Sequence, residues 1–228
     1  MFLLDTRTAF FLLLVISLAF ALASAAAVSF RFRDGMGKWA IALLIEAAAF
    51  VLYGLRDVLP DTAAVAVPNA LFIFALAMKT QAVLEFYGRR LAAPWLMVPA
   101  LLVALAFYLA VDHFALRVIL AGVCIGAAMM AVAIVVHRIA PTRRPARWMI
   151  MVGYLVGSAT FAARAALAAL DPGGLRAFLD PSLFQSVSLA SMAAVQLFTS
   201  LGFVLLHLER AEEAAQRLAV IDPLTAVF

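Results

Sequence analysis

The hydrophobic positions of this 228-residue chain form long runs separated by short polar segments. There are seven runs, over residues 8–29, 39–55, 64–86, 92–111, 115–136, 147–169 and 183–207. A helix needs ~20 such residues to cross ~30 Å of hydrocarbon. Apolar and polar residues do not alternate with a period of two, so helices are favoured over a membrane β-barrel. The pattern predicts an all-α membrane protein, a seven-transmembrane helix bundle.

Composition supports a membrane location. Hydrophobic residues make up 67% of the chain and charged residues 13%, against ~45–50% and ~25% in soluble domains. The first run could be a signal peptide, because Ala21, Ala23 and Ala25 resemble a cleavage region. However, residues 1–7 carry one acidic and one basic side chain, and the next basic residues follow the run. We therefore expect the first run to be retained as a membrane helix.

Basic side chains are unequally divided between alternate loops. Eleven fall on one side and four on the other. The larger set is Arg31, Arg33, Lys38, Arg89, Arg90, Arg138, Arg143, Arg144, Arg147, Arg210 and Arg217, and the smaller set is Arg7, Arg56, Arg117 and Arg176. The positive-inside rule then predicts an external N-terminus and a cytoplasmic C-terminus. This topology accounts for the net charge of +4 without a nucleic-acid partner.

Two ionisable residues inside the runs are predicted to pair. Glu46 lies eight residues beyond Lys38, and Lys79 lies ten residues before Arg89, which places both ~12–15 Å from the same membrane edge. An ionisable side chain at mid-bilayer costs at least ~2.5 kcal/mol. A Glu46–Lys79 ion pair would satisfy both groups. It could serve packing alone or act as a proton-sensitive switch.

Polar residues in the opposite half suggest a ligand pocket. Arg164 is seven residues before Asp171, ~10 Å from that edge. It either extends its side chain outward to water or faces a cavity that binds an anionic group. Arg56, Tyr53 and Asn69 fall in the same layer. These three residues and Arg164 form our candidate site for a small anionic or lipid-like ligand.

No metal or cofactor site is predicted. Cys124 is the only cysteine, and His137 and His207 share a depth but provide only two ligands where a metal normally takes three or four. The last run has no lysine for a retinal Schiff base.

Two G-x-x-x-G pairs, at 122–126 and 153–157, indicate close helix contacts, either within the bundle or at a dimer surface.

A heptad pattern leads out of the last run. Its apolar positions, spaced alternately by three and four residues, are Leu201, Val204, Leu208, Ala211, Ala215 and Leu218. Charged residues occupy the other faces. This stripe predicts a parallel, dimeric signalling helix in the cytoplasm and hence a homodimer. A simple amphipathic linker is the alternative.

The chain then reads Asp222, Pro223, Leu224, Thr225. This D-P-L-T sequence resembles the start of the GGDEF domain of diguanylate cyclases, which join two GTP molecules into cyclic di-GMP. The family usually continues D-x-L-T-G-L-x-N-R, whereas Ala226 and Val227 replace the Gly and the Leu here. A second pattern, W…LR-x-x-L-P…N…F-x-G, resembles the multi-span sensor region that precedes many proteobacterial GGDEF domains. It is carried by Trp39, Leu55, Arg56, Leu59, Pro60, Asn69, Phe86 and Gly88, with Tyr53 just before it.

The resemblance implies a sensor domain over 1–207, a signalling helix over 208–221 and the first residues of a truncated GGDEF domain over 222–228. It implies a bacterial inner membrane protein that controls a diguanylate cyclase, with GTP and Mg²⁺ bound by the missing domain and no catalytic residue in this chain. Two other functions remain open: a passive dimerising membrane anchor for the cyclase, and a small-molecule transporter, since Pro68 and Pro99 fall within runs.

Overall fold

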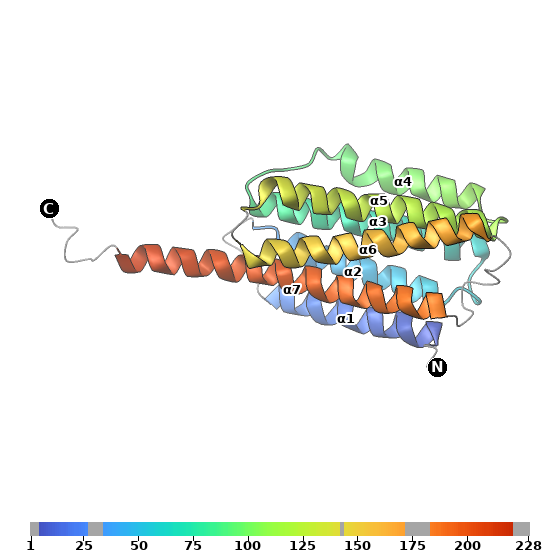
Figure 1. The fold of residues 1–228 in the computed structure, drawn as a ribbon, viewed down its shortest axis with the longest axis horizontal. Coiled ribbons are helices and arrows are strands. Elements are labelled where there is room, and N and C mark those ends of the chain that lie inside the picture. Colours follow the sequence, from blue (N-terminus) through green and yellow to red (C-terminus); the bar gives the residue numbers. More distant parts are fainter. Residues whose placement is uncertain (1–4, 27–33, 142–143, 172–182, 221–228) are drawn as a thin grey trace.

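The computed structural model describes residues 5–26, 34–141, 144–171 and 183–220, without the side chains of 183–184 and 218–220. Over these residues the chain is all-helical, with seven helices and no strand, which confirms the predicted all-α class (Figure 1). The helices are α1 (Thr6–Ala26), α2 (Met36–Gly54), α3 (Asp61–Phe86), α4 (Pro94–Leu109), α5 (Phe114–Ile139), α6 (Pro145–Leu170) and α7 (Leu183–Val220). Arg31, Arg33, Arg143, Arg176 and the D-P-L-T sequence lie outside the described residues.

Six of these helices are long and apolar enough to cross a membrane. The exception is α4, where a span was expected over 92–111. It has only 16 residues, which gives ~24 Å of helix against ~30 Å of hydrocarbon. Pro94 starts the helix, and the turn at Ala110 ends it, so the apolar run is longer than the helix it contains.

The six longer helices form a closed ring. Contacts run from α1 to α2, α3, α5, α6, α7 and back to α1, while α4 packs outside the ring, mainly on α3. Figure 1 shows α4 at the edge of the bundle. Its outward side chains are large and apolar: Trp95, Leu101, Leu105 and Leu109 are each more than half exposed. Such a surface is suited to lipid rather than to water.

Both glycine pairs lie at contacts within this ring. A Cβ atom at Gly122 would lie 2.5 Å from the Cβ of Ala165, and one at Gly153 would lie 2.8 Å from Thr199 Cγ2. The first pair brings α5 against α6, and the second brings α6 against α7. The glycines therefore allow close packing inside one chain.

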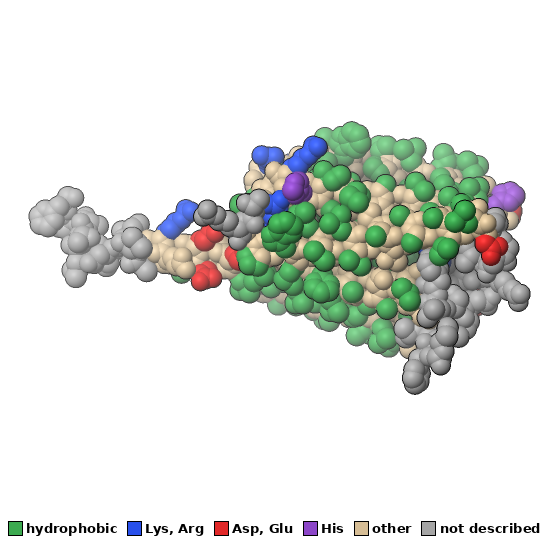
Figure 2. Space-filling model, viewed as in Figure 1, with side chains coloured by type: hydrophobic (Ala, Val, Ile, Leu, Met, Phe, Trp, Pro, Cys, Tyr) green, Lys and Arg blue, Asp and Glu red, His purple; other side chains and the backbone are tan. Residues whose placement is uncertain are grey.

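The bundle has two distinct ends. α7 projects beyond it at one end, which we call the stalk end (Figure 1). The N-terminus of α1 lies at the opposite end, which we call the cavity end for the cavity described below. Hydrophobic side chains cover the flank of the bundle, and lysines and arginines gather near the stalk end (Figure 2).

Candidate functional site

A cavity lies within the ring near the cavity end. Its wall includes all four predicted ligand residues, Tyr53, Arg56, Asn69 and Arg164. The volume that the centres of water molecules can occupy in it is about 90 Å³. A single bound water needs ~10–15 Å³ of such volume. The structure therefore brings the predicted residues together around a space large enough for a small organic molecule.

Three arginines line this cavity: Arg56, Arg117 and Arg164. Arg56 lies in the turn after α2, where burial, aided by the nearby cation of Arg117, lowers its pKa to about 10. It is therefore still charged at neutral pH. Among the described residues that line the wall, none is an aspartate or a glutamate. The described part of the wall therefore carries positive charge, and Asp57, Asp61 and Asp112, which act on Arg56 or Arg117, are exposed residues outside it.

Tyr53 and Asn69 form the fixed polar part of the wall. The Tyr53 hydroxyl donates to Asn69 Oδ1 at 2.9 Å, and Asn69 Nδ2 donates to the Val65 carbonyl at 2.7 Å. The Tyr53 ring stacks on Phe10, with 5.4 Å between centroids. Both side chains are buried, and these two hydrogen bonds hold them in place beside the arginines.

Glu46 and Lys79 meet in the interior of the ring, away from the cavity wall. Lys79 Nζ donates to Glu46 Oε2 at 2.7 Å and to Gln196 Oε1 at 3.2 Å. Gln196 Nε2 in turn donates to Ser17 Oγ at 3.2 Å. The pair is 1–2% exposed. This buried polar network joins α1, α2, α3 and α7, so α7 is tied to the ring at mid-length.

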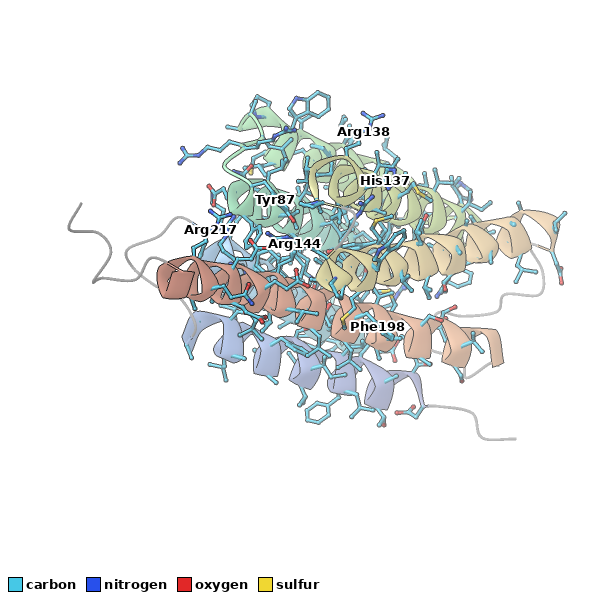
Figure 3. The ribbon with its side chains drawn as sticks, turned by 60° about the vertical axis from the view of Figure 1, so that its left-hand side comes forward. Tyr87, His137, Arg138, Arg144, Phe198 and Arg217 are labelled. Atoms are coloured by element: carbon cyan, nitrogen blue, oxygen red, sulfur yellow. The ribbon has the colours of Figure 1, made fainter. Side chains whose placement is uncertain are left out.

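At the stalk end, α7 is held by a second set of polar contacts, which we call the junction. Arg210 donates to the Phe86 carbonyl and places its guanidinium 3.6 Å from the Phe86 ring centroid. Glu209 accepts from the Ala146 backbone N–H at 3.1 Å, near the start of α6. The Arg144 guanidinium donates to both carboxylate oxygens of Glu213 at 2.7 Å. Figure 3 shows Arg144 and Tyr87 beside α7 at this level.

The two histidines predicted to share a depth, His137 and His207, lie in separate environments. His207 belongs to the junction: its Nε2 is 3.2 Å from the Asp34 carbonyl oxygen, and its ring packs on Phe86. His137, at the end of α5, accepts from the buried Arg147 guanidinium at 2.8 Å through Nδ1. In the described part of the chain, no three His, Cys, Asp or Glu side chains form a group that could hold a metal.

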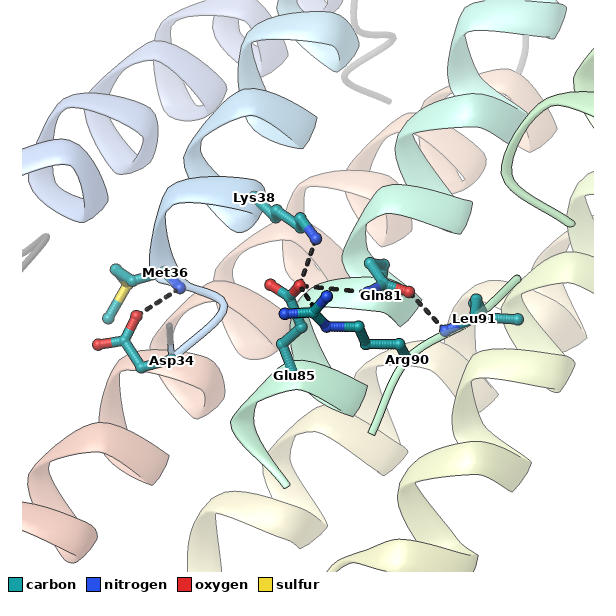
Figure 4. Close-up of polar contacts among 7 residues, drawn as sticks. All are labelled: Asp34, Met36, Lys38, Gln81, Glu85, Arg90 and Leu91. Atoms are coloured by element: carbon teal, nitrogen blue, oxygen red, sulfur yellow. Dashed lines mark hydrogen bonds and ion pairs between the residues drawn. The ribbon is translucent and has the colours of Figure 1, made fainter. Parts of the chain in front are cut away.

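A further cluster of polar contacts joins the start of α2 to the end of α3, also at the stalk end (Figure 4). Glu85 pairs with Lys38 and accepts from Gln81 Nε2 at 3.3 Å, while Gln81 Oε1 accepts from the Leu91 backbone N–H at 2.7 Å. Gly35, before α2, has a φ of +83°, and a Cβ there would lie 2.1 Å from the Ala82 carbonyl oxygen. These contacts leave α2 and α3 little freedom at this end.

The predicted stripe on α7 faces away from the ring. Leu201 is 48% exposed and Leu208 60%, and Ala211 and Ala215 are also exposed. Val204 is partly buried, and the side chain of Leu218 lies outside the described residues. The neighbouring Phe203 and Leu206 are fully buried, so α7 presents one face to the ring and leaves the heptad face uncovered.

Sequence reasoning missed several residues of the wall. Arg117 had been assigned to a loop, yet it lies in the first turns of α5 and lines the cavity, as do Gln185 and Ser188 of α7. The available signal for α7 was the group of polar residues near its start, Gln185, Ser186, Ser188 and Ser191. No protein-family model matches this chain, and searches of curated proteins and of solved structures also found no match.

Proposed function

We propose that this chain is a membrane sensory domain, in which the occupancy of the cavity is relayed through α7 to a cytoplasmic diguanylate cyclase. The continuity of α7 carries the proposal. This one helix of 38 residues contributes Ser188 to the cavity wall, Gln196 to the buried network and Arg210 to the junction. A change at Ser188 therefore has an unbroken mechanical path of ~48 Å along the helix to Val220.

The residues of the W…LR-x-x-L-P…N…F-x-G pattern support the same relay. Arg56 and Asn69 line the cavity. Trp39 stacks on Phe203 of α7 with 4.2 Å between centroids, and Phe86 receives Arg210. A pattern shared with sensor regions thus divides between the cavity and the surfaces that hold α7. This distribution is expected if both places serve one function.

We further propose seven spans, an external N-terminus and a cytoplasmic stalk in a bacterial inner membrane. The eleven-to-four distribution of basic residues supports this orientation. α4 supports the seventh span, because it links the stalk end of α3 to the cavity end of α5. A short helix can cross by thinning the bilayer locally.

The uncovered heptad face supports a homodimer. Leu208, Ala211 and Ala215 are exposed beyond the ring, where a second copy of the helix would cover them in a parallel coiled coil. Two cyclase domains, each with GTP and Mg²⁺, would then be brought together. Cysteines introduced at Ala211 and Ala215 in a Cys124→Ser background should cross-link in membranes, whereas cysteine at Arg217, off the stripe, should cross-link less.

The alternative is a passive dimerising anchor, which the same exposed stripe would also favour. A fusion of this chain to a GGDEF domain at Asp222 separates the two, with cyclic di-GMP production in membranes as the readout. A relay predicts that Gln196→Leu, which cuts the buried network, changes the activity severalfold. Leu197→Met, at an exposed neighbouring position, should have no effect.

An anchor predicts equal activity in both variants and in a fusion whose residues 1–207 are replaced by an unrelated dimeric membrane helix. Unchanged activity in all three would overturn the relay. Expression in the membrane is checked for each variant, so that a loss of protein is not taken for a change in signalling.

A further inference from the structure

The cavity wall combines two kinds of surface. Arg117 and Arg164 bring guanidinium groups to it, and Phe10, Phe72, Phe107 and Phe114 are among its aromatic residues. The aromatic side chains come from α1, α3, α4 and α5, and the two arginines from α5 and α6. A ligand that fits this wall needs one charged group and a larger apolar part.

The two helical arginines have unused hydrogen-bonding capacity. Among the described residues, no hydrogen bond or ion pair reaches the side chain of Arg164. Arg117 Nε is buried without a hydrogen-bond partner, and its guanidinium only faces the Phe114 ring, 5.4 Å from the centroid. Asp61 and Asp112 act on Arg117 electrostatically but are exposed, and Asp57 pairs with Arg7. A guanidinium offers five N–H donors, and leaving them unpaired in a membrane interior is costly.

We propose that the cavity binds an organic anion, whose carboxylate or phosphate group is held by Arg117 and Arg164 and whose apolar body lies along the phenylalanines. This inference rests on the proposed sensory function and specifies its ligand class. Arginine suits planar or tetrahedral oxyanions because its N–H groups bind two oxygens at once. The volume of about 90 Å³ is several times that needed for a single water or halide.

Binding to the chain in phosphatidylcholine nanodiscs tests the proposal, followed by tryptophan fluorescence and by the midpoint of thermal unfolding. The probe is 3-phenylpropionate. The uncharged 3-phenylpropanol, the cationic 3-phenylpropylamine and inorganic phosphate are its controls. Dihexanoyl phosphatidic acid carries the same head chemistry on a lipid body, so it separates a soluble acid from a lipid as the source.

We expect saturable binding and a raised midpoint with 3-phenylpropionate or with the phosphatidic acid, and not with the alcohol, the amine or phosphate. Arg117→Gln and Arg164→Gln should each weaken this binding by roughly tenfold or more, as the loss of a charge-assisted hydrogen bond does. Arg138→Gln, an exposed arginine at the other end of α5, should bind as the parent does. The unliganded Arg164→Gln protein should unfold no earlier than the parent, which a structural role for Arg164 would not allow.

Equal binding of the alcohol or the amine, equal stabilisation by phosphate, or unchanged affinity in both cavity variants would overturn the proposal. So would a failure of both anionic probes to bind the parent protein. The relay is tested by a different result. If anions bind but Gln196→Leu leaves cyclase activity unchanged, the anion site is supported and the sensory function is overturned.

Discussion

Three arginines at the stalk end and two at the cavity end differ in their hydrogen-bond partners. At the stalk end, Arg144 pairs with Glu213, Arg147 donates to His137, and Arg210 donates to the Phe86 carbonyl. At the cavity end, Arg117 and Arg164 reach no such partner among the described residues. All five side chains carry the same positive charge, so the two groups differ only in the hydrogen-bond acceptors that lie around them.

This contrast separates structural from functional charge. Arg144 Nη1 and Arg147 Nε are buried without a partner among the described residues, as Arg117 Nε is. The stalk-end guanidiniums nevertheless donate other hydrogen bonds, which join α6 to α5 and α7 to α3. A cation left without partners in a membrane span costs stability, and such residues generally mark functional sites. The stalk-end contacts hold α7 against the ring, whereas the two cavity-end arginines leave N–H donors that the proposed ligand would bind.

The largest loss of stability is expected for the Glu46–Lys79 pair at mid-length of the bundle, where both charges are buried and paired. Glu46→Ala should lower the free energy of unfolding by ~3–5 kcal/mol, because it leaves Lys79 as an uncompensated buried cation. The control is the double variant Glu46→Met with Lys79→Met, which removes both charges and should recover most of the loss. Denaturation in detergent micelles measures both. A double variant as unstable as the single one would show that packing, and not charge, sets the cost.

Glycines near the two ends of α2 allow the packing of the stalk end and the cavity end to be compared. Gly35→Ala at the stalk end should destabilise by ~2–4 kcal/mol, since alanine would be strained at a φ of +83° and would overlap the Ala82 carbonyl. Gly54→Ala at the cavity end meets nothing within 4 Å and should be neutral or stabilising by ~0.5–1 kcal/mol. Thermal midpoints of the two variants check this, and equal losses would contradict a tighter stalk end.

Arg147 tests the stalk-end arginines directly. Its side chain is 2% exposed, and Arg147→Gln breaks its bonds to the ring nitrogen and the carbonyl of His137. The expected loss is ~1–3 kcal/mol, the cost of leaving buried polar groups unsatisfied. Arg138→Gln, exposed on the neighbouring helix, should change stability by less than ~0.5 kcal/mol.

The smallest effect is expected for Arg164→Gln without ligand. Because no partner among the described residues is lost, the change in unfolding free energy should stay within ~0.5 kcal/mol or be stabilising. The same denaturation experiment applies. A loss as large as that of Arg147→Gln would remove the distinction between the two ends.

Depth along each run made part of the site predictable. Counting residues from charged boundaries placed Glu46 level with Lys79, and Tyr53, Arg56, Asn69 and Arg164 in one layer. This works because the rise of a helix is nearly constant. The count does not give the direction in which each side chain points. Arg117, at the start of the fifth run, therefore counts only as a boundary charge in the sequence, although it lines the cavity.

The ring itself was not predictable. Seven apolar runs gave no sign that six would close on each other with α4 outside, because every run is apolar on most of its faces. In lipid, hydrophobicity does not distinguish a helix face that contacts protein from one that contacts acyl chains. Gln196 illustrates the problem: nothing local to residue 196 indicates that its partners are Lys79 and Ser17.

The sequence alone determined the helical class, the approximate bounds of most helices, the shared level of Glu46 and Lys79 along the bundle and the heptad stripe on α7. Each of these follows from the spacing of residue types along one axis. The tertiary structure alone decided which cations have partners, which residues meet around the cavity and which face of α7 stays uncovered. Those properties depend on how helices are rotated and ordered around the ring, and that is set by contacts such as Gly122 on Ala165 and Trp39 on Phe203, between residues far apart in the chain.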